Sequence, residues 1–224
     1  SPEVALSLSQ YGSVLFQEAR YAEAAEQYHD SHAIYRELYG QHGAATAITL
    51  ANYADALGEQ GEHARALALT REALVGYRKA FGDDSPRTGG LWSKIGDQLM
   101  ANGRVDEAVD AYDRSLAVLR RQPDNKAMRQ AIAVGRSKRA LALHRHGDDD
   151  EALAEARAAE RVLREATGGS GVYHGHALAN LLRIACHARA GDCATLRRQA
   201  QAVLRDPEKS GSVRLQLRQA LAVP

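Results

Sequence analysis

The sequence predicts an all-α protein built from pairs of helices in tandem. Trp92, Ile95 and Leu99 lie at i, i+3 and i+7, which places them on one face of a helix. Gly103 interrupts this stretch, and a second helical stripe begins at Ala108. The same pattern is found 42 and 84 residues earlier, at Leu50, Tyr53, Leu57, Gly61 and Ala66, and at Leu8, Tyr11, Leu15, Ala19 and Ala24. A repeat of this period predicts stacked helical units, because one such unit cannot bury its apolar face alone.

The repeat period divides the chain into five repeats and a terminal helix. We predict repeats at residues 3–42, 43–84, 85–124, 125–171 and 172–206 and a capping helix at 208–223, all within one domain over 1–224. A cap is expected because the open end of an array exposes an apolar face. Gly40 and Gly82 end the second helices of the first two repeats and suit a left-handed C-terminal cap. Pro86 suits the first turn of the next helix, where its missing N–H is not needed.

The last two repeats depart from the pattern of the first three. The helices of the fourth are predicted at about 126–146 and 150–166, and Arg136 stands where Trp92 stands in the third. The fifth repeat is the most degenerate, with helices at about 174–190 and 193–205. We expect less regular packing in this part of the chain.

Composition and charge argue against several classes of partner. Charged residues make up 25% of the chain, but the formal net charge is only +1, so nothing favours nucleic acid. No apolar run approaches the ~18 residues of a membrane span, and no signal peptide is visible, so we expect a cytoplasmic location without membrane contact. Ser85-Pro86 follows Ser1-Pro2 by two repeat periods, and no Met precedes Ser1. We therefore expect a fragment of a larger protein that begins on a repeat boundary.

Cys186 and Cys193, the two cysteines of the chain, are seven residues apart. They lie at the predicted end of one helix and the start of the next. We expect free thiols in a reducing compartment and keep a disulfide as the alternative. Two cysteines without clustered ligands do not form a zinc site.

Within each repeat, large, small and aromatic residues follow an order that resembles the tetratricopeptide repeat. Trp92, Gly96 and Tyr112 belong to the best match, and the 42-residue period resembles the kinesin-light-chain type of this repeat. The resemblance covers residues 3–121 strongly and 126–205 weakly. It implies a right-handed α-solenoid, or superhelix, of about five helix pairs. The small residues would let the two helices of each pair approach closely.

The resemblance also implies a binding surface, because the first helices of tetratricopeptide repeats line a concave groove that holds peptides or partner segments. The groove positions carry Ser9, Ser13, Phe16, Gln17, Asp55, Glu59, Ser93, Asp97, Met100, Ser137, Leu141, His144, Arg145 and Arg189. In the fifth repeat the same mapping also gives Leu178, Leu181, Ala185 and Ala188.

The predicted groove has an acidic middle and a basic end. Asp55, Glu59 and Asp97 form the middle, and residues 144–145 with Arg189 form the end. This arrangement suits an extended or helical peptide with a basic segment and an acidic end. The alternative is a solvated polar face without a ligand. The Lys, Asn and Arg positions with which co-chaperone members hold a C-terminal carboxylate carry Ser, Asp and Ala here, so that specificity is not implied.

No stretch shows the arrangement of a catalytic or metal centre. Residues 144–151 include His, Asp and Glu, but we interpret them as a turn that leads into an Asp-capped helix N-terminus. His174 and His176 are interpreted as loop residues. Residues 168–171 are rich in glycine but lack the Lys of a phosphate-binding loop. We therefore expect no enzyme activity, no cofactor and no metal.

These features favour a protein–protein interaction scaffold whose groove binds a peptide or a partner protein. By resemblance to arrays appended to bacterial serine/threonine kinases, the parent is expected to be a bacterial signalling or regulatory protein. One alternative is a regulatory module that senses a peptide or small ligand. Another is a self-association module that forms a homodimer through the C-terminal repeat.

Overall fold

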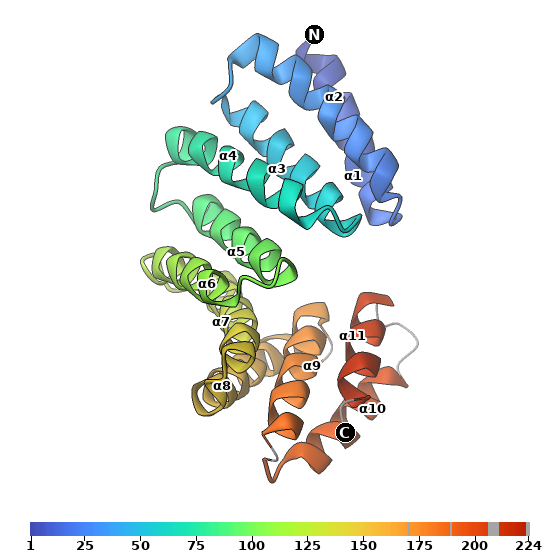
Figure 1. Ribbon diagram of the computed structural model, residues 1–224, viewed down its shortest axis with the longest axis vertical. Coiled ribbons are helices and arrows are strands. Elements are labelled where there is room, and N and C mark those ends of the chain that lie inside the picture. The colour runs from blue at the N-terminus through green and yellow to red at the C-terminus, as the bar shows by residue number, and fades with distance from the viewer. Residues whose placement is uncertain (170, 189, 206–210, 223–224) are drawn as a thin grey trace. The chain divides into compact units, whose positions relative to one another are not determined.

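The computed structural model describes residues 1–169, 171–188, 190–205 and 211–222, and within them the chain is all-α (Figure 1). Two compact units are present, residues 1–118 and 119–224. The predicted fold class, an all-α solenoid of helix pairs, is confirmed.

In unit 1 the helices follow one another in three pairs. They are α1 (Pro2–Gln17), α2 (Tyr21–Tyr39), α3 (Ala44–Glu59), α4 (His63–Phe81), α5 (Pro86–Ala101) and α6 (Val105–Arg120). Successive helices from α1 to α5 pack against each other. Ser85 caps α5 by accepting a hydrogen bond from the Arg87 N–H, and Pro86 occupies the first turn, as predicted. Gly61 and Gly103 adopt φ values of 86° and 74° in the turns within the second and third pairs, a conformation that favours glycine.

Unit 2 contains a fourth pair, a fifth pair and a last helix. They are α7 (Lys126–His146), α8 (Asp149–Thr167), α9 (Val172–His187), α10 (Cys193–Leu204) and α11 (Gly211–Leu221). The predicted loop at His174 and His176 is wrong, because both residues lie in the first turns of α9. The predicted Asp-rich N-terminus is confirmed, with Asp148 at the N-cap of α8 and Asp149 and Asp150 in its first turn, but Asp148 makes no side-chain capping bond.

In the first and third pairs, a glycine in the first helix faces a tyrosine in the second. A Cβ on Gly96 would lie 2.6 Å from the ring of Tyr112, and one on Gly12 would lie 3.0 Å from the ring of Tyr28. Both tyrosines are buried. Their hydroxyls donate hydrogen bonds to the residue after each glycine, to Asp97 over 2.9 Å and to the Ser13 hydroxyl over 3.1 Å. The glycine therefore sets how closely the two helices approach.

In the fourth pair, charged contacts are present in addition to buried apolar residues such as Ala140 and Ala156. Arg136, at the position of the third repeat's tryptophan, donates two hydrogen bonds to Glu155, over 2.9 and 3.1 Å. One helical turn further along α7, Arg139 pairs with Glu151 over 2.7 Å. These pairs join α7 to α8. Trp92 itself is half-buried and lies beneath the Arg114 guanidinium, 4.8 Å from the ring centroid.

Two features close unit 2. The terminal helix α11 packs on α9 and buries Val213 and Leu217, so the predicted cap is confirmed within 211–221. The remainder of the predicted range, 208–210 and 223, lies outside the described residues. Cys186 and Cys193 form a disulfide with their Cα atoms 5.0 Å apart, which corrects the expectation of free thiols. Cys186 lies at the end of α9, and Cys193, seven residues later, begins α10. The turn between the two helices therefore brings the two sulfur atoms within bonding range.

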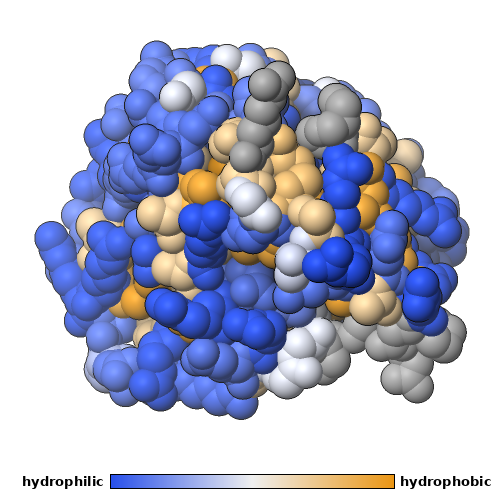
Figure 2. All heavy atoms as spheres, turned by 90° about the horizontal axis from the view of Figure 1, so that it is seen from below, coloured by the Kyte–Doolittle hydropathy of each residue, from blue (hydrophilic) through white to orange (hydrophobic). Residues whose placement is uncertain are grey.

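Figure 2 shows a face on which hydrophilic residues predominate and smaller hydrophobic areas are exposed between them. Within the described ranges, no helix is both long enough and apolar enough to cross a membrane.

The two glycines of α5 give a matched test of the packing. Gly96→Ala should lower the free energy of unfolding by ~1–3 kcal/mol, because its Cβ would collide with the Tyr112 ring. Gly90→Ala lies in the same helix with no atom within 4 Å of the added Cβ. It should raise stability by ~0.5–1 kcal/mol, the usual gain from glycine to alanine in a helix. Urea unfolding of both variants measures the two effects. Equal effects would contradict the helix register described for α5 and α6.

Candidate functional site

Unit 2 contains a cavity of about 620 Å³ between α7, α9 and the terminal helix α11. Its lining residues are Lys138, Leu141, His144 and Arg145 from α7, His176, Asn180, Arg183 and His187 from α9, and Gln216 and Gln219 from α11. The residues from α9 are spaced i, i+4, i+7 and i+11, which is one stripe of a helix. The helix spacing therefore directs this polar stripe to one surface, while the apolar stripe of α9 enters the core.

Hydrogen bonds hold the side chains of the cavity in place. Arg183 donates to the Gln219 side-chain oxygen over 3.0 Å and to the Gln216 carbonyl over 3.5 Å, which links α9 to α11. Asn180 donates to the Ser137 hydroxyl over 3.1 Å, which links α9 to α7. The floor of the cavity is thus tied to all three helices.

The cavity is electropositive. It presents the cations Lys138, Arg145 and Arg183, and no carboxylate is among its described lining residues. Burial, and secondarily the charge of Arg145, lowers the pKa of Arg183. Burial, with a further contribution from Lys138, also lowers the pKa of the His176 imidazole. Burial is the main cause of both shifts, and a neighbouring cation makes the smaller contribution, which a ligand with carboxylate or phosphate groups would offset.

The structure places the predicted basic groove residues in different environments. Leu141, His144 and Arg145 line the cavity. Ser137 is buried and bonded to Asn180. Arg189 lies outside the described residues.

The mapping of the fifth repeat was shifted relative to the structure. Leu178, Leu181 and Ala185 are buried, so they belong to the core. The cavity is instead lined by the polar stripe from His176 to His187, which sequence reasoning missed. Its regular helical spacing is the signal that could have found it.

The predicted acidic residues of unit 1 lie near one another. Partial burial raises the pKa of the Glu59 carboxyl, and the charges of Asp55 and Asp97 raise it further. Asp55 forms an ion pair with Lys94, and Asp97 accepts the Tyr112 hydroxyl. We call these three residues the acidic face of unit 1. It consists of Asp55 and Glu59 from α3 and Asp97 from α5.

The other predicted residues of unit 1 surround this face or lie on α1. Ser13 donates to the Ser9 carbonyl over 2.9 Å. Phe16 is half-buried and makes an edge-to-face contact with Tyr21, with ring centroids 5.2 Å apart. Gln17 is exposed at the end of α1. Ser93 and Met100 are half-buried on α5.

Residues 3–79 match the family model described as tetratricopeptide repeat. These residues are tetratricopeptide repeats. The match covers α1 to α3 and most of α4, and the resemblance inferred from the sequence is thereby confirmed. No match to the chain is found among curated proteins.

Solved structures extend the likeness of fold beyond the matched repeats. The kinesin-light-chain TPR-like repeats of Podospora anserina superpose with a TM-score of 0.72 at 16% identity, over 94% of this chain and 99% of theirs. The apo quorum sensor NprR from B. thuringiensis superposes with a TM-score of 0.73 at 14% identity, over 99% of this chain and 59% of its own. A Rap protein complexed with competence and sporulation factor gives 0.73 at 14%, over 94% and 54%. At these identities the likeness concerns the fold of the tetratricopeptide-repeat array.

His176 links the stability of unit 2 to pH. Because burial lowers its pKa in the folded protein, the unfolded chain, with a pKa near 6.5, binds the proton more readily. The stabilising effect of the neutral imidazole is therefore fully present above 6.5 and is lost as the pH falls from that value through the lowered pKa of the folded state. Between about pH 7.5 and about pH 5.5, the Tm of His176→Gln should fall less than that of the unaltered protein. His146→Gln, at an exposed residue of the same unit, is the control and should follow the unaltered protein. Identical slopes for all three proteins would exclude this role for His176.

Proposed function

We propose that this chain is a protein-interaction module, not an enzyme, and that the cavity of unit 2 binds an acidic peptide or an acidic segment of a partner protein. The observation that carries the proposal is the cavity itself, lined by Lys138, Arg145 and Arg183 without a carboxylate among its described lining residues. Charge complementarity of this kind favours selection of the partner and fast association.

The shape and chemistry of the cavity favour a peptide. Its polar amides, Asn180, Gln216 and Gln219, can hydrogen-bond backbone or side-chain groups, and Leu141 offers an apolar contact. Arginine forks bind carboxylates in a bidentate manner. The cavity therefore offers an anionic segment both charge pairing and hydrogen bonds.

The acidic face of unit 1 suggests a second contact, with a ligand of the opposite charge. Its pKa-shifted Glu59 is unfavourably placed beside Asp55 and Asp97, and a basic segment would relieve that repulsion. We propose that this face binds a basic peptide segment.

Sensing is the second candidate function, because a quorum sensor shares the fold over 99% of this chain. In that case, ligand binding would change the arrangement of the repeats. We also propose, from sequence resemblance, that the parent is a bacterial signalling or regulatory protein in the cytoplasm. The Cys186–Cys193 disulfide does not support the cytoplasmic part of this proposal, because a reducing compartment keeps such thiols reduced.

A crossover experiment tests the binding proposal. Labelled Glu-rich and Lys-rich peptides of equal length are titrated by fluorescence anisotropy against three variants. Arg145→Glu reverses an exposed charge of the cavity and should weaken the Glu-rich peptide roughly tenfold, leaving the Lys-rich peptide unchanged. Glu59→Lys should weaken the Lys-rich peptide and leave the Glu-rich peptide unchanged.

The matched control is Arg161→Glu, which makes the same charge change at an exposed residue of α8 outside the cavity. It should leave the affinity of both peptides within about twofold. If Arg145→Glu and Arg161→Glu weaken the Glu-rich peptide equally, the attraction is non-specific and the cavity is not the site.

A further inference from the structure

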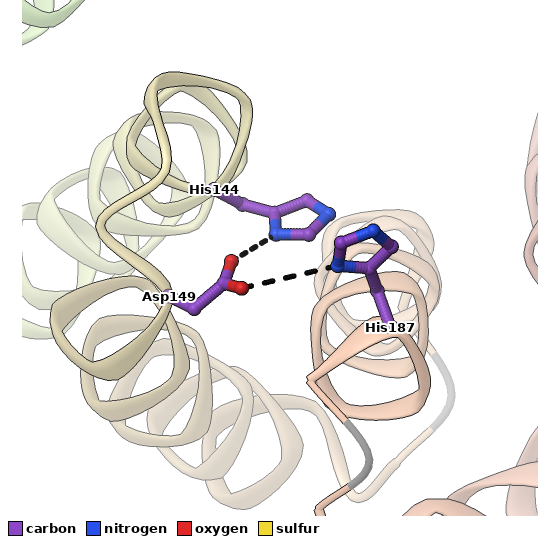
Figure 3. A group of neighbouring side chains, drawn as sticks. All are labelled: His144, Asp149 and His187. Atoms are coloured by element: carbon purple, nitrogen blue, oxygen red, sulfur yellow. Dashed lines mark hydrogen bonds and ion pairs between the residues drawn. The ribbon is translucent and has the colours of Figure 1, made fainter.

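We propose that His144, Asp149 and His187 form a binding site for a divalent transition-metal ion. Figure 3 shows the three side chains pointing toward one another from different helices. His144 comes from the last turn of α7, Asp149 from the first residue of α8 and His187 from the last residue of α9. The inference concerns the metal alone and does not depend on the proposed peptide function.

The distances between the three side chains are close to those of a metal-ligand set. The Nδ1 of His144 lies 2.5 Å from one oxygen of Asp149, and the Nδ1 of His187 lies 3.8 Å from the other. One ligand atom from each residue can be chosen so that all three lie within 4.8 Å of one another. Two ligands bound at 2.0–2.1 Å to a tetrahedral ion are ~3.4 Å apart. Small side-chain rotations therefore suffice to place an ion between them.

His187 can make this adjustment most easily, because it is the least buried of the three residues. The His187 side chain is 66% exposed, whereas that of His144 is 14% exposed. His144 and Asp149 thus form the fixed part of the site, and His187 can turn toward the ion. Its backbone is held by the neighbouring Cys186–Cys193 disulfide, which fastens the end of α9 to α10.

The donor set favours a borderline ion such as zinc. Two imidazole nitrogens and one carboxylate oxygen form a ligand set that zinc commonly adopts, with a fourth position for water. Without the ion, a hydrogen bond joins Nδ1 of His144 to Asp149. With the ion bound, the neutral imidazole would carry its proton on Nε2, and Nδ1 would coordinate the ion.

The charge around the site combines attraction and repulsion. Arg145, beside His144, opposes a cation, whereas Asp148 and Asp150 flank Asp149 and favour one. The fourth position would lie near the cavity, which both His144 and His187 also line. A metal here would join the fourth helix pair to the fifth by coordination.

Zinc titration of the tag-free chain, without reductant, tests the site. Keeping the disulfide intact prevents the two cysteines from acting as ligands. Isothermal titration calorimetry should show one zinc ion per chain, and zinc should raise the Tm, whereas magnesium at the same concentration should not. Absence of saturable zinc binding at neutral pH would overturn the proposal.

The variants separate the cluster from adventitious histidine binding. His187→Ala and Asp149→Asn should each weaken zinc binding at least about tenfold, while the Tm without zinc stays within about 2 °C for the exposed His187. His146→Ala removes an exposed histidine two residues from His144 and should leave the affinity unchanged. Equal weakening by His146→Ala and His187→Ala, or none by either, would show that these three residues do not form the site.

Discussion

Close contact between the two helices of a pair is the constraint on which unit 1 depends. The Tyr112 ring packs so closely against Gly96 that a Cβ would not fit, and the Tyr28 ring packs against Gly12 in a similar way. Because the tyrosine hydroxyl also bonds to the residue after the glycine, each contact fixes both the distance and the register. Each repeat is thereby a rigid building block that stacks on its neighbours, which is how such arrays gain stability.

In the fourth pair, ion pairs also hold the two helices together. Arg136 and Arg139 reach from α7 to glutamates of α8, and His144 reaches to Asp149 at the turn. These polar contacts are added to buried apolar residues such as Ala140 and Ala156, and they place several charged side chains along α7. The electropositive cavity and the histidine cluster of unit 2 combine side chains of α7 with residues of the neighbouring helices.

Most of the fold could be predicted from the sequence, because apolar spacing, turn glycines and a constant period all indicated the same helices. The helix of residues 126–146 was predicted at its observed ends although its apolar stripe is weak. The cavity itself was not predicted, although three residues of the expected groove line it. Leu141, His144 and Arg145 were found by counting from Gly96, but the count slips in α9, where Leu178 and Leu181 are core residues. Periodicity locates a face only when the register is known, and degenerate repeats lose that register.

Other features depended on contacts that spacing does not encode. Asp149 and His187 are far apart in the sequence and meet only because α8 and α9 pack together. The disulfide depended on the geometry of the turn between α9 and α10. By contrast, the proximity of Asp55, Glu59 and Asp97 did follow from the repeat, since equivalent positions of stacked units lie side by side.

Hydrogen–deuterium exchange of the chain with and without a Glu-rich peptide tests the central claim most directly, namely that the cavity of unit 2 is the binding surface. The account predicts slower exchange on peptide binding in α7, α9 and α11, the helices that line the cavity, and little change in α8 and α10. Slower exchange confined to α8 and α10, or to unit 1, would contradict it.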